Sequence, residues 1–135
     1  MTEVVRLEDI SKFYHTKSGE TQALKDINFT VAENEFVSII GPSGCGKSTI
    51  LSIIAGLEKP SGGTVYINGE ATENKIHAHI GYMLQQDHLF PWLTVKQNAL
   101  LGLDIRHEKT KEKEAYVEAL LRQYELESFS DALPS

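Results

Sequence analysis

A glycine-rich segment, Gly41–Thr49, carries residue types that suit the binding of a polyphosphate. The phosphate-loop pattern G-x-x-x-x-G-K-[ST] is matched by Gly41-Pro42-Ser43-Gly44-Cys45-Gly46-Lys47-Ser48. Gly44 and Gly46 let backbone N–H groups approach phosphate oxygens closely, and they tolerate the unusual dihedral angles this requires. Lys47 supplies a positive charge for the β- and γ-phosphates, and Ser48 offers a hydroxyl to Mg²⁺.

Two other interpretations of this segment are weaker. A glycine-rich turn with an incidental lysine would not need a buried strand before it and a helix after it, and both are expected here. A dinucleotide-binding G-x-G-x-x-G site would need an acidic residue at the end of a following strand, and none stands at the expected distance. The loop alone does not name a reaction, because kinases, GTPases, helicases and transport motors share it.

The elements around the loop are expected to hold it between a strand and a helix. The nearly continuous apolar run Phe36–Ile40 predicts a strand covered on both faces. Lys47–Ala55 predicts a helix whose positive N-terminal end points at the phosphates and whose C-terminal end is marked by Gly56. Upstream, Val4–Phe13 and Leu24–Val31 predict strands joined by a loop at His15–Glu20.

Further elements are expected after the helix. Thr64–Asn68 and Ile80–Leu84 predict short strands, and Thr94 with Gln97 predicts a capping box that opens a helix to about Leu101. A second helix is expected over Lys111–Leu126, with Val117, Leu120, Leu121 and Tyr124 on one stripe. The order of elements predicts an α/β fold with an antiparallel part and a helical appendage.

Composition and charge exclude several classes of protein. The 135 residues are 41% hydrophobic and 24% charged, as in a globular domain, and the net charge of −6 with no dense basic cluster argues against nucleic-acid binding. The longest apolar stretches are far shorter than the roughly 18–20 residues of a membrane-spanning helix, and the N-terminus lacks the pattern of a secretory signal. Cys45 is the only cysteine, so an internal disulfide is impossible, which fits a reducing compartment.

Along nearly its whole length, the sequence resembles the ATP-binding subunits of ABC transporters. The resemblance rests on the order and spacing of several segments: Tyr14 after Ser11-Lys12-Phe13, Ala23-Leu24-Lys25-Asp26-Ile27, Gly41–Thr49, Ala55-Gly56-Leu57, Pro60-Ser61-Gly62, Gly69, Gly81-Tyr82-Met83-Leu84-Gln85 and Leu89–Val95. It implies a P-loop NTPase of the ABC type with an antiparallel β subdomain, an incomplete core sheet and the start of a helical subdomain. Residues 1–93 would form the β subdomain and loop core, and residues 94–135 the start of the helical subdomain.

The resemblance also implies roles for individual residues. Tyr14 would stack on adenine, although it is also explained by packing within a loop. The nucleotide would be bound by Tyr14, Gly41, Pro42, Ser43, Gly44, Cys45, Gly46, Lys47, Ser48, Thr49 and Gln85. Ser48 and Gln85 would hold Mg²⁺, with Gln86 as a rival for the glutamine position. Phe90-Pro91-Trp92 would face a membrane permease or pack beneath the helical subdomain.

The implied function is ATP binding and hydrolysis coupled to transport across a membrane. Its partners would be an integral membrane permease, a second ATP-binding subunit and, in an importer, a substrate-binding protein. The subunit would lie in the cytoplasm, peripheral at the inner face of the cell membrane. The segment Leu89–Val95 resembles that of importers for small oxyanions and sulfonates, and the sequence as a whole looks most similar to importers of nitrate, sulfonate or taurine type.

The chain departs from this family by ending before the signature motif, the Walker B strand and the switch histidine. Lys47 and Gln85 contribute to catalysis in such a site, but the general base is missing, so the chain is expected to bind ATP with Mg²⁺ weakly, to be poorly stable and not to hydrolyse ATP. Two alternatives stay open. One is a naturally short, non-catalytic module that binds nucleotide or a permease, and the other, a weaker one, is a small P-loop kinase.

Overall fold

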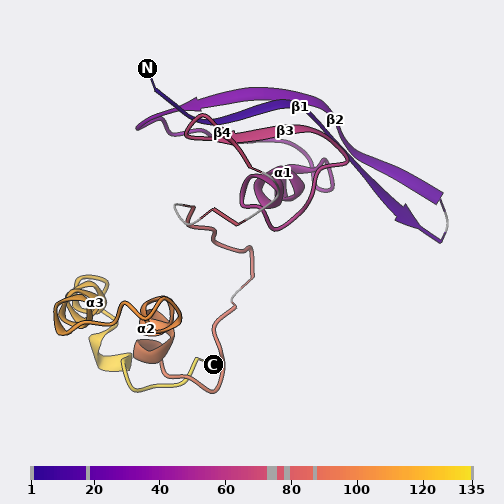
Figure 1. Ribbon diagram of the computed structural model, residues 1–135. Coiled ribbons are helices and arrows are strands. Elements are labelled where there is room, and N and C mark those ends of the chain that lie inside the picture. Colours follow the sequence, from indigo (N-terminus) through magenta and orange to yellow (C-terminus); the bar gives the residue numbers. More distant parts are fainter. Residues whose placement is uncertain (1, 18, 73–75, 78–79, 87, 135) are drawn as a thin grey trace. The chain divides into compact units, whose positions relative to one another are not determined.

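The first part of the chain forms a long antiparallel hairpin (Figure 1). The structure is a computed structural model that describes residues 2–17, 19–72, 76–77, 80–86 and 88–134. Strand β1 (Glu3–Thr16) pairs with β2 (Gly19–Ala32), from Thr16 opposite Gly19 to Glu3 opposite Ala32. Both strands predicted here are confirmed. The loop expected at His15–Glu20 is shorter than predicted, because strand pairing continues almost to the turn.

On its other edge, β1 pairs antiparallel with β3 (Gly62–Ile67), which pairs in turn with the short β4 (Glu70–Ala71). The sheet has four strands in the order β2-β1-β3-β4. The turn between β3 and β4 is Asn68-Gly69, and both residues have positive φ (51° and 82°). A two-residue turn with these angles suits the right-handed twist of a hairpin, which explains the Asn-Gly pair at this place.

Helix α1 (Lys47–Ile54) packs against this sheet. Its buried Ile50 and Ile53 join the core formed by Leu7, Ile10, Leu24, Val65 and Ile67. The helix ends as its sequence predicts: Gly56 has a φ of +71°, its N–H donates to the Ile53 carbonyl, and the N–H of Leu57 donates to the Ser52 carbonyl. This pair of hydrogen bonds is the Schellman arrangement, which fixes the direction of the chain after α1.

Two apolar runs that were expected to be strands are not strands. Phe36–Ile40 and Ile80–Leu84 have no regular secondary structure. The side chains of Phe36, Ile40 and Met83 are 94%, 90% and 94% exposed. A strand needs a neighbour that satisfies its backbone hydrogen bonds, and among the described residues the sheet is made of β1 to β4. The apolar pattern therefore predicted a buried strand correctly only where a neighbouring strand is present to pair with it.

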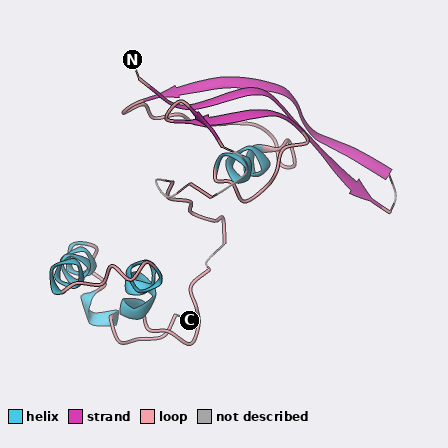
Figure 2. Ribbon diagram, viewed as in Figure 1, coloured by secondary structure: helices cyan, strands magenta, loops and turns pink. Residues whose placement is uncertain are grey.

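Helices follow from Val95 onward, after a stretch drawn as loop (Figure 2). Helix α2 (Val95–Ile105) begins with the predicted capping box of Thr94 and Gln97 and runs past the expected end at Leu101. Helix α3 (Lys111–Gln123) is capped by Thr110 and ends before Leu126, and a 3₁₀ helix (Glu127–Phe129) follows. Leu100 of α2 and Leu121 of α3 are buried, whereas Tyr124, expected on the apolar stripe, is 67% exposed.

The chain divides into two compact units, Met1–Met83 and Leu84–Ser135. The first contains the sheet, α1 and the glycine-rich loop, and the second contains α2 and α3. Within the described ranges, no helix has the length and apolar character needed to cross a bilayer.

Candidate functional site

Lys47, the first residue of α1, holds the glycine-rich loop together. Its ammonium donates to the backbone carbonyl of Gly41 at 2.8 Å and to that of Pro42 at 2.6 Å. The same nitrogen lies 3.6 Å from the sulfur of Cys45. Lys47 therefore connects the end of the loop to its beginning. Its positive charge lies beside the carbonyl groups of the first two loop residues.

The loop follows a path that only glycine adopts without strain. Gly44 and Gly46 have φ values of +79° and +96°, as predicted for the close approach of backbone to phosphate. Gly46 is also confined: a Cβ atom there would lie 2.6 Å from Leu24 Cδ2 and 2.8 Å from the Ala23 carbonyl oxygen. The end of the loop is thus seated directly against β2, which fixes where α1 starts.

The N-terminus of α1 presents an electrostatic environment that favours an anion. Its N-cap, Gly46, offers no side-chain cap, and its first turn contains no acidic residue. The positive end of the helix dipole and the Lys47 ammonium therefore act in the same direction. Ser48, the second residue of the helix, is exposed, so its hydroxyl is accessible to a metal ion bound to phosphate.

Tyr14 lies near the end of β1, paired with Thr21 of β2, so it is part of a strand rather than of a loop. Tyr14 is 38% exposed, and the ammonium of Lys12 lies 5.1 Å from the centroid of its ring. Lys12 was not singled out from the sequence. Its burial could have been expected from its position two residues after Ile10, because side chains two apart in a strand lie on the same face and Ile10 is fully buried.

Gln85 and its rival Gln86 belong to the second unit, where both are exposed in a bend. The expectation that Gln85 stands at the end of a strand is wrong, because the preceding residues, Ile80–Leu84, form none. Within the described residues, the side-chain amide of Gln85 is exposed and has no fixed hydrogen-bond partner. It is therefore accessible to a metal ion or to water.

The loop Phe90-Pro91-Trp92 is joined by hydrogen bonds to Asn98 of α2. The Asn98 side-chain oxygen accepts from the Phe90 N–H at 2.8 Å, and its nitrogen donates to the carbonyls of Phe90, Leu93 and Thr94. The rings of Phe90 and Trp92 contact each other with centroids 5.1 Å apart, and Trp92 is 69% exposed. The structure thus presents an ordered aromatic surface in the second unit.

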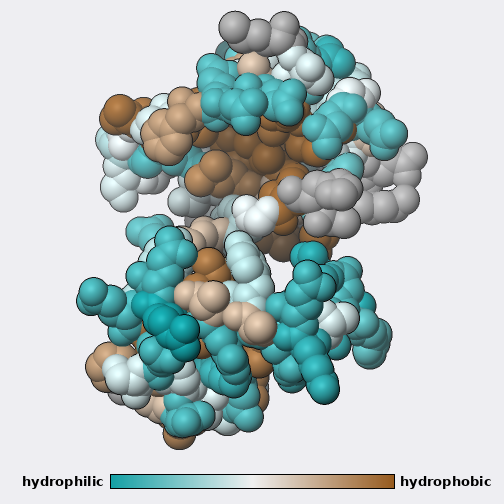
Figure 3. Space-filling view, turned by 90° about the vertical axis from the view of Figure 1, so that its left-hand side faces the viewer, coloured by the Kyte–Doolittle hydropathy of each residue, from teal (hydrophilic) through white to brown (hydrophobic). Residues whose placement is uncertain are grey.

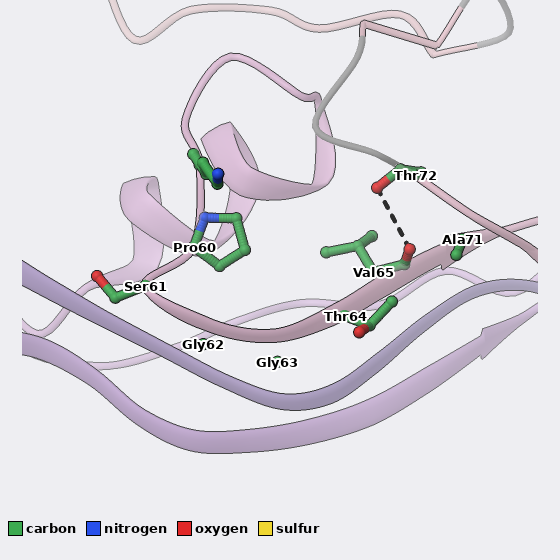
Figure 4. A pocket seen from close by; sticks show the side chains of 9 residues that line it. Pro60, Ser61, Gly62, Gly63, Thr64, Val65, Ala71 and Thr72 are labelled. Atoms are coloured by element: carbon green, nitrogen blue, oxygen red, sulfur yellow. Dashed lines mark hydrogen bonds between the residues drawn. The ribbon is translucent and has the colours of Figure 1, made fainter.

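A hollow of about 350 Å³ lies beside β3 and β4 (Figure 4). It is lined by Lys59, Pro60, Ser61, Gly62, Gly63, Thr64, Val65, Ala71 and Thr72, with the Thr72 hydroxyl donating to the Val65 carbonyl at 3.2 Å. None of the residues expected to bind nucleotide lines it, so this hollow is separate from the candidate site.

Comparison with known proteins gives one consistent result. The family model for the ABC transporter matches residues 24–135. The uncharacterized ABC transporter ATP-binding protein YtlC of Bacillus subtilis is 45% identical over 122 residues, which are 90% of this chain and 46% of that protein. The aliphatic sulfonates import ATP-binding protein SsuB of Bacillus cereus is 41% identical over 109 residues, covering 81% of this chain and 43% of SsuB.

A further relative and a solved structure extend the comparison. The probable sulfate/thiosulfate import ATP-binding protein CysA of Chlorella vulgaris is 39% identical over 133 residues, covering 97% of this chain and 55% of CysA. The ATP-binding cassette MJ0796, solved as a dimer in a post-hydrolysis state bound to ADP and Pi, superposes with a TM-score of 0.83 and 36% identity. That alignment covers 96% of this chain and 61% of the cassette.

The chain spans about half the length of the curated relatives it matches. Over that span, the antiparallel sheet, the phosphate loop at the start of α1 and the helices agree with the expected ABC-type P-loop fold. The chain therefore belongs to the ABC transporter family, as part of an ATP-binding domain.

Proposed function

We propose that this chain binds ATP with Mg²⁺ through Gly41–Thr49, as part of the ATP-binding subunit of an ABC importer. The observation that carries the proposal is the loop itself. Its glycines have positive φ, its lysine stands at the start of α1, and no acidic side chain opposes an anion in the first turn of that helix. The family match supports the same ligand, since the cassette MJ0796 was solved with ADP and Pi.

In this proposal, each predicted site residue has a physical task. Lys47 exchanges its contacts with the loop carbonyls for the β- and γ-phosphates, while the N–H groups at the start of α1 bind phosphate oxygens. Ser48 and Gln85 contribute oxygen atoms to Mg²⁺, whose other ligands are phosphate oxygens and water. Tyr14 stacks against the adenine, and Pro42, Ser43, Cys45 and Thr49 complete the wall of the phosphate site.

The 135-residue chain on its own is proposed to bind nucleotide without turning it over. Hydrolysis needs a base that positions water at the γ-phosphate, and in this family that base follows a Walker B strand. Neither that strand nor the signature motif occurs in this sequence. We also propose that the β subdomain with the loop core ends at residue 93 and that the helical subdomain starts at residue 94. The subunit would lie in the cytoplasm, at the inner face of the cell membrane.

The transported substrate is proposed to be a small sulfur oxyanion or sulfonate. SsuB is named for import of aliphatic sulfonates and CysA for import of sulfate and thiosulfate, and each is about 40% identical to this chain. The partners would then be a membrane permease, a second ATP-binding subunit and a substrate-binding protein. The ordered Phe90–Trp92 loop is the surface we assign to the permease.

The proposal is tested by titrating ATP and Mg²⁺ into the ¹⁵N-labelled chain and following amide chemical shifts, a method that measures weak binding. We expect saturable shifts at Gly41–Thr49, and Lys47→Ala should weaken binding about 10- to 150-fold, because charge-assisted hydrogen bonds contribute about 1.5–3 kcal/mol. Lys25→Ala, at an exposed position of β2, is the matched control and should leave binding unchanged. Equal binding by the Lys47→Ala variant would contradict the proposed site.

The absence of turnover is tested separately, by phosphate release. The unmodified chain and the Lys47→Ala variant should give the same background rate. Release that is faster in the unmodified chain and lost with Lys47→Ala would show that the chain hydrolyses ATP, and the non-catalytic part of the proposal would then be wrong.

A further inference from the structure

Lys12 is a cation that the fold buries almost completely. It is 9% exposed, and lysine is rarely buried to this degree unless its ammonium is paired. The ammonium donates to the Lys59 carbonyl at 2.7 Å and forms an ion pair with Glu58 at 2.5 Å. Both partners belong to the turn that directly follows α1, so this one side chain joins β1 to the C-terminal end of α1.

Backbone contacts reinforce the same junction. The N–H of Ser61 donates to the Ser11 carbonyl at 2.8 Å, and the N–H of Phe13 donates to the Ser61 hydroxyl at 3.0 Å. The turn is therefore fixed to β1 on either side of Lys12. Since α1 begins at the phosphate loop, the position of β1 relative to that loop is set through α1 and this turn.

The third neighbour of the Lys12 ammonium is the ring of Tyr14, whose centroid is 5.1 Å away. This lies within the range of about 6 Å in which a cation is attracted to an aromatic face. The ammonium is fixed by Glu58 and Lys59, so it acts on the ring from a fixed position. Tyr14 as a residue keeps 38% of its surface exposed. It is thus restrained on the protein side while part of its surface stays available to a ligand.

We propose that Lys12 is a positioning residue for base recognition: it holds the Tyr14 ring in the orientation that stacks on the purine of the nucleotide. This inference rests on the proposed function, which assigns adenine stacking to Tyr14. A ring that is already ordered loses less conformational freedom when the base binds, and this lower cost appears as tighter binding. Lys12 then affects binding of the base and leaves binding of the phosphates unchanged.

A pair of ligands separates the two contributions. ATP carries both base and phosphates, whereas inorganic tripolyphosphate carries the phosphates alone. We expect the unmodified chain to bind ATP more tightly than tripolyphosphate, by about 5- to 150-fold if the difference comes from base stacking. Tyr14→Ala should remove most of this advantage of ATP. Lys12→Met should reduce the advantage about 3- to 10-fold, as for a lost cation–π contact, with tripolyphosphate affinity unchanged.

Matched variants make the result specific to Lys12. Lys25→Met removes an exposed lysine from β2 and should change neither affinity. Lys12→Arg keeps the positive charge and should retain most of the ATP advantage. If Lys12→Met does not fold, as judged by circular dichroism, Glu58→Gln tests the same point by removing the charge that fixes the ammonium, and a selective loss of the ATP advantage is expected.

The possible outcomes distinguish this inference from the function on which it rests. The positioning role would be overturned if the ATP advantage is unchanged in Lys12→Met or, where that variant does not fold, in Glu58→Gln. It would also be overturned by an equal loss of affinity for both ligands, because that result indicates a purely structural lysine. If the unmodified chain binds neither ligand, or binds both equally, the proposed nucleotide site or its stacking tyrosine fails, and this inference fails with it.

Discussion

The phosphate loop depends on a small number of residues that cannot be exchanged freely. Lys47 bridges the loop to its own start through the Gly41 and Pro42 carbonyls. Gly46 is held at a φ of +96° and lies against the backbone of Ala23. The loop is therefore shaped by contacts with β2 as well as by its own sequence.

The two glycines with positive φ should differ in their tolerance of substitution. Both Gly44→Ala and Gly46→Ala place a side chain in a left-handed conformation, which costs about 1–2 kcal/mol. Only Gly46→Ala also forces a Cβ against the Ala23 carbonyl, whereas nothing lies within 4 Å of the corresponding atom at Gly44. We expect the thermal midpoint to fall at least about 5 °C further in Gly46→Ala. Equal melting of the two variants would contradict the seating of the loop against β2.

At this scale, the sequence predicted backbone conformation better than side-chain contacts. The spacing of Gly44 and Gly46 in the phosphate-loop pattern was sufficient to expect unusual dihedral angles. The contacts of Lys12 were not predictable, because they depend on Glu58 and Lys59, which lie far along the chain and approach only when α1 packs on the sheet. Pattern analysis reports what a segment prefers locally and does not identify distant partners.

Among the elements, α2 and the loop before it form one hydrogen-bonded assembly. Asn98→Ala would remove the side-chain partner of the Phe90 N–H and of the Leu93 carbonyl, whereas the Phe90 and Thr94 carbonyls keep backbone donors. The loss should destabilise the second unit by about 1–3 kcal/mol. Trp92 is the only tryptophan, so its fluorescence anisotropy reports on this loop alone. We expect lower anisotropy and a lower thermal midpoint by tryptophan emission. Gln123→Ala, at the exposed end of α3, is the control, and matching behaviour of the two variants would exclude a bracing role for Asn98.

The end of α3 is linked to the 3₁₀ helix by a forked ion pair. Arg122 donates to both carboxylate oxygens of Glu127, with the shortest distance 2.9 Å. The hydrogen bond and then the charge of Arg122 lower the pKa of Glu127 below its ordinary value of 4.5. Because the pKa is lower in the folded chain, the pair stabilises above the ordinary value, and this contribution is lost as pH falls through the lowered pKa.

A pH series therefore tests the Arg122–Glu127 pair. The difference in thermal midpoint between the unmodified chain and Glu127→Gln should be present at pH 7 and should be lost as the pH falls below 4.5 and through the lowered pKa of Glu127. The effect is small because both groups are exposed, and high salt should weaken it further. Glu125→Gln removes a nearby exposed carboxylate as the control. A difference that stays constant with pH would mean that Glu127 acts through shape rather than charge.

The helices were predicted from sequence more reliably than the strands. Caps such as Thr94 with Gln97 are local, so they act wherever the segment lies. The hairpin strands were predicted because each is the immediate sequence neighbour of its partner. Phe36–Ile40 and Ile80–Leu84 failed because their apolar character indicates burial in a sheet, and strand formation requires partners that the described residues do not provide.

On the scale of the whole molecule, the sheet-containing unit displays apolar surface. Figure 3 shows apolar side chains gathered on this unit, and Phe36, Ile40, Ile76 and Met83 are each more than 70% exposed. An apolar area of this kind is uncommon on a monomer and marks an interaction surface or a tendency to aggregate. The chain should therefore bind the dye ANS and associate at high concentration.

Replacing exposed apolar residues should reduce dye binding and association without unfolding the chain. Phe36→Ser combined with Ile40→Ser should lower ANS fluorescence and leave the thermal midpoint within about 2 °C, because neither side chain is buried. Ile53→Ser is the opposite control, since Ile53 is 2% exposed in the core and its loss should cost about 2–5 kcal/mol. A large fall in the midpoint of the double variant would show that the segment is packed.

The pairing of β1 with both of its neighbours has a consequence for the order of folding events. Contacts between β1 and β2 begin with Thr16 opposite Gly19, so the hairpin can close in microseconds, whereas β1 meets β3 only through pairs such as Val5 with Ile67. The phosphate loop and α1 lie inside that long closure, so we expect them to acquire their final form late. A bound nucleotide would consequently retard unfolding far more than it accelerates folding, giving this chain a ligand-dependent lifetime at a nearly constant refolding rate.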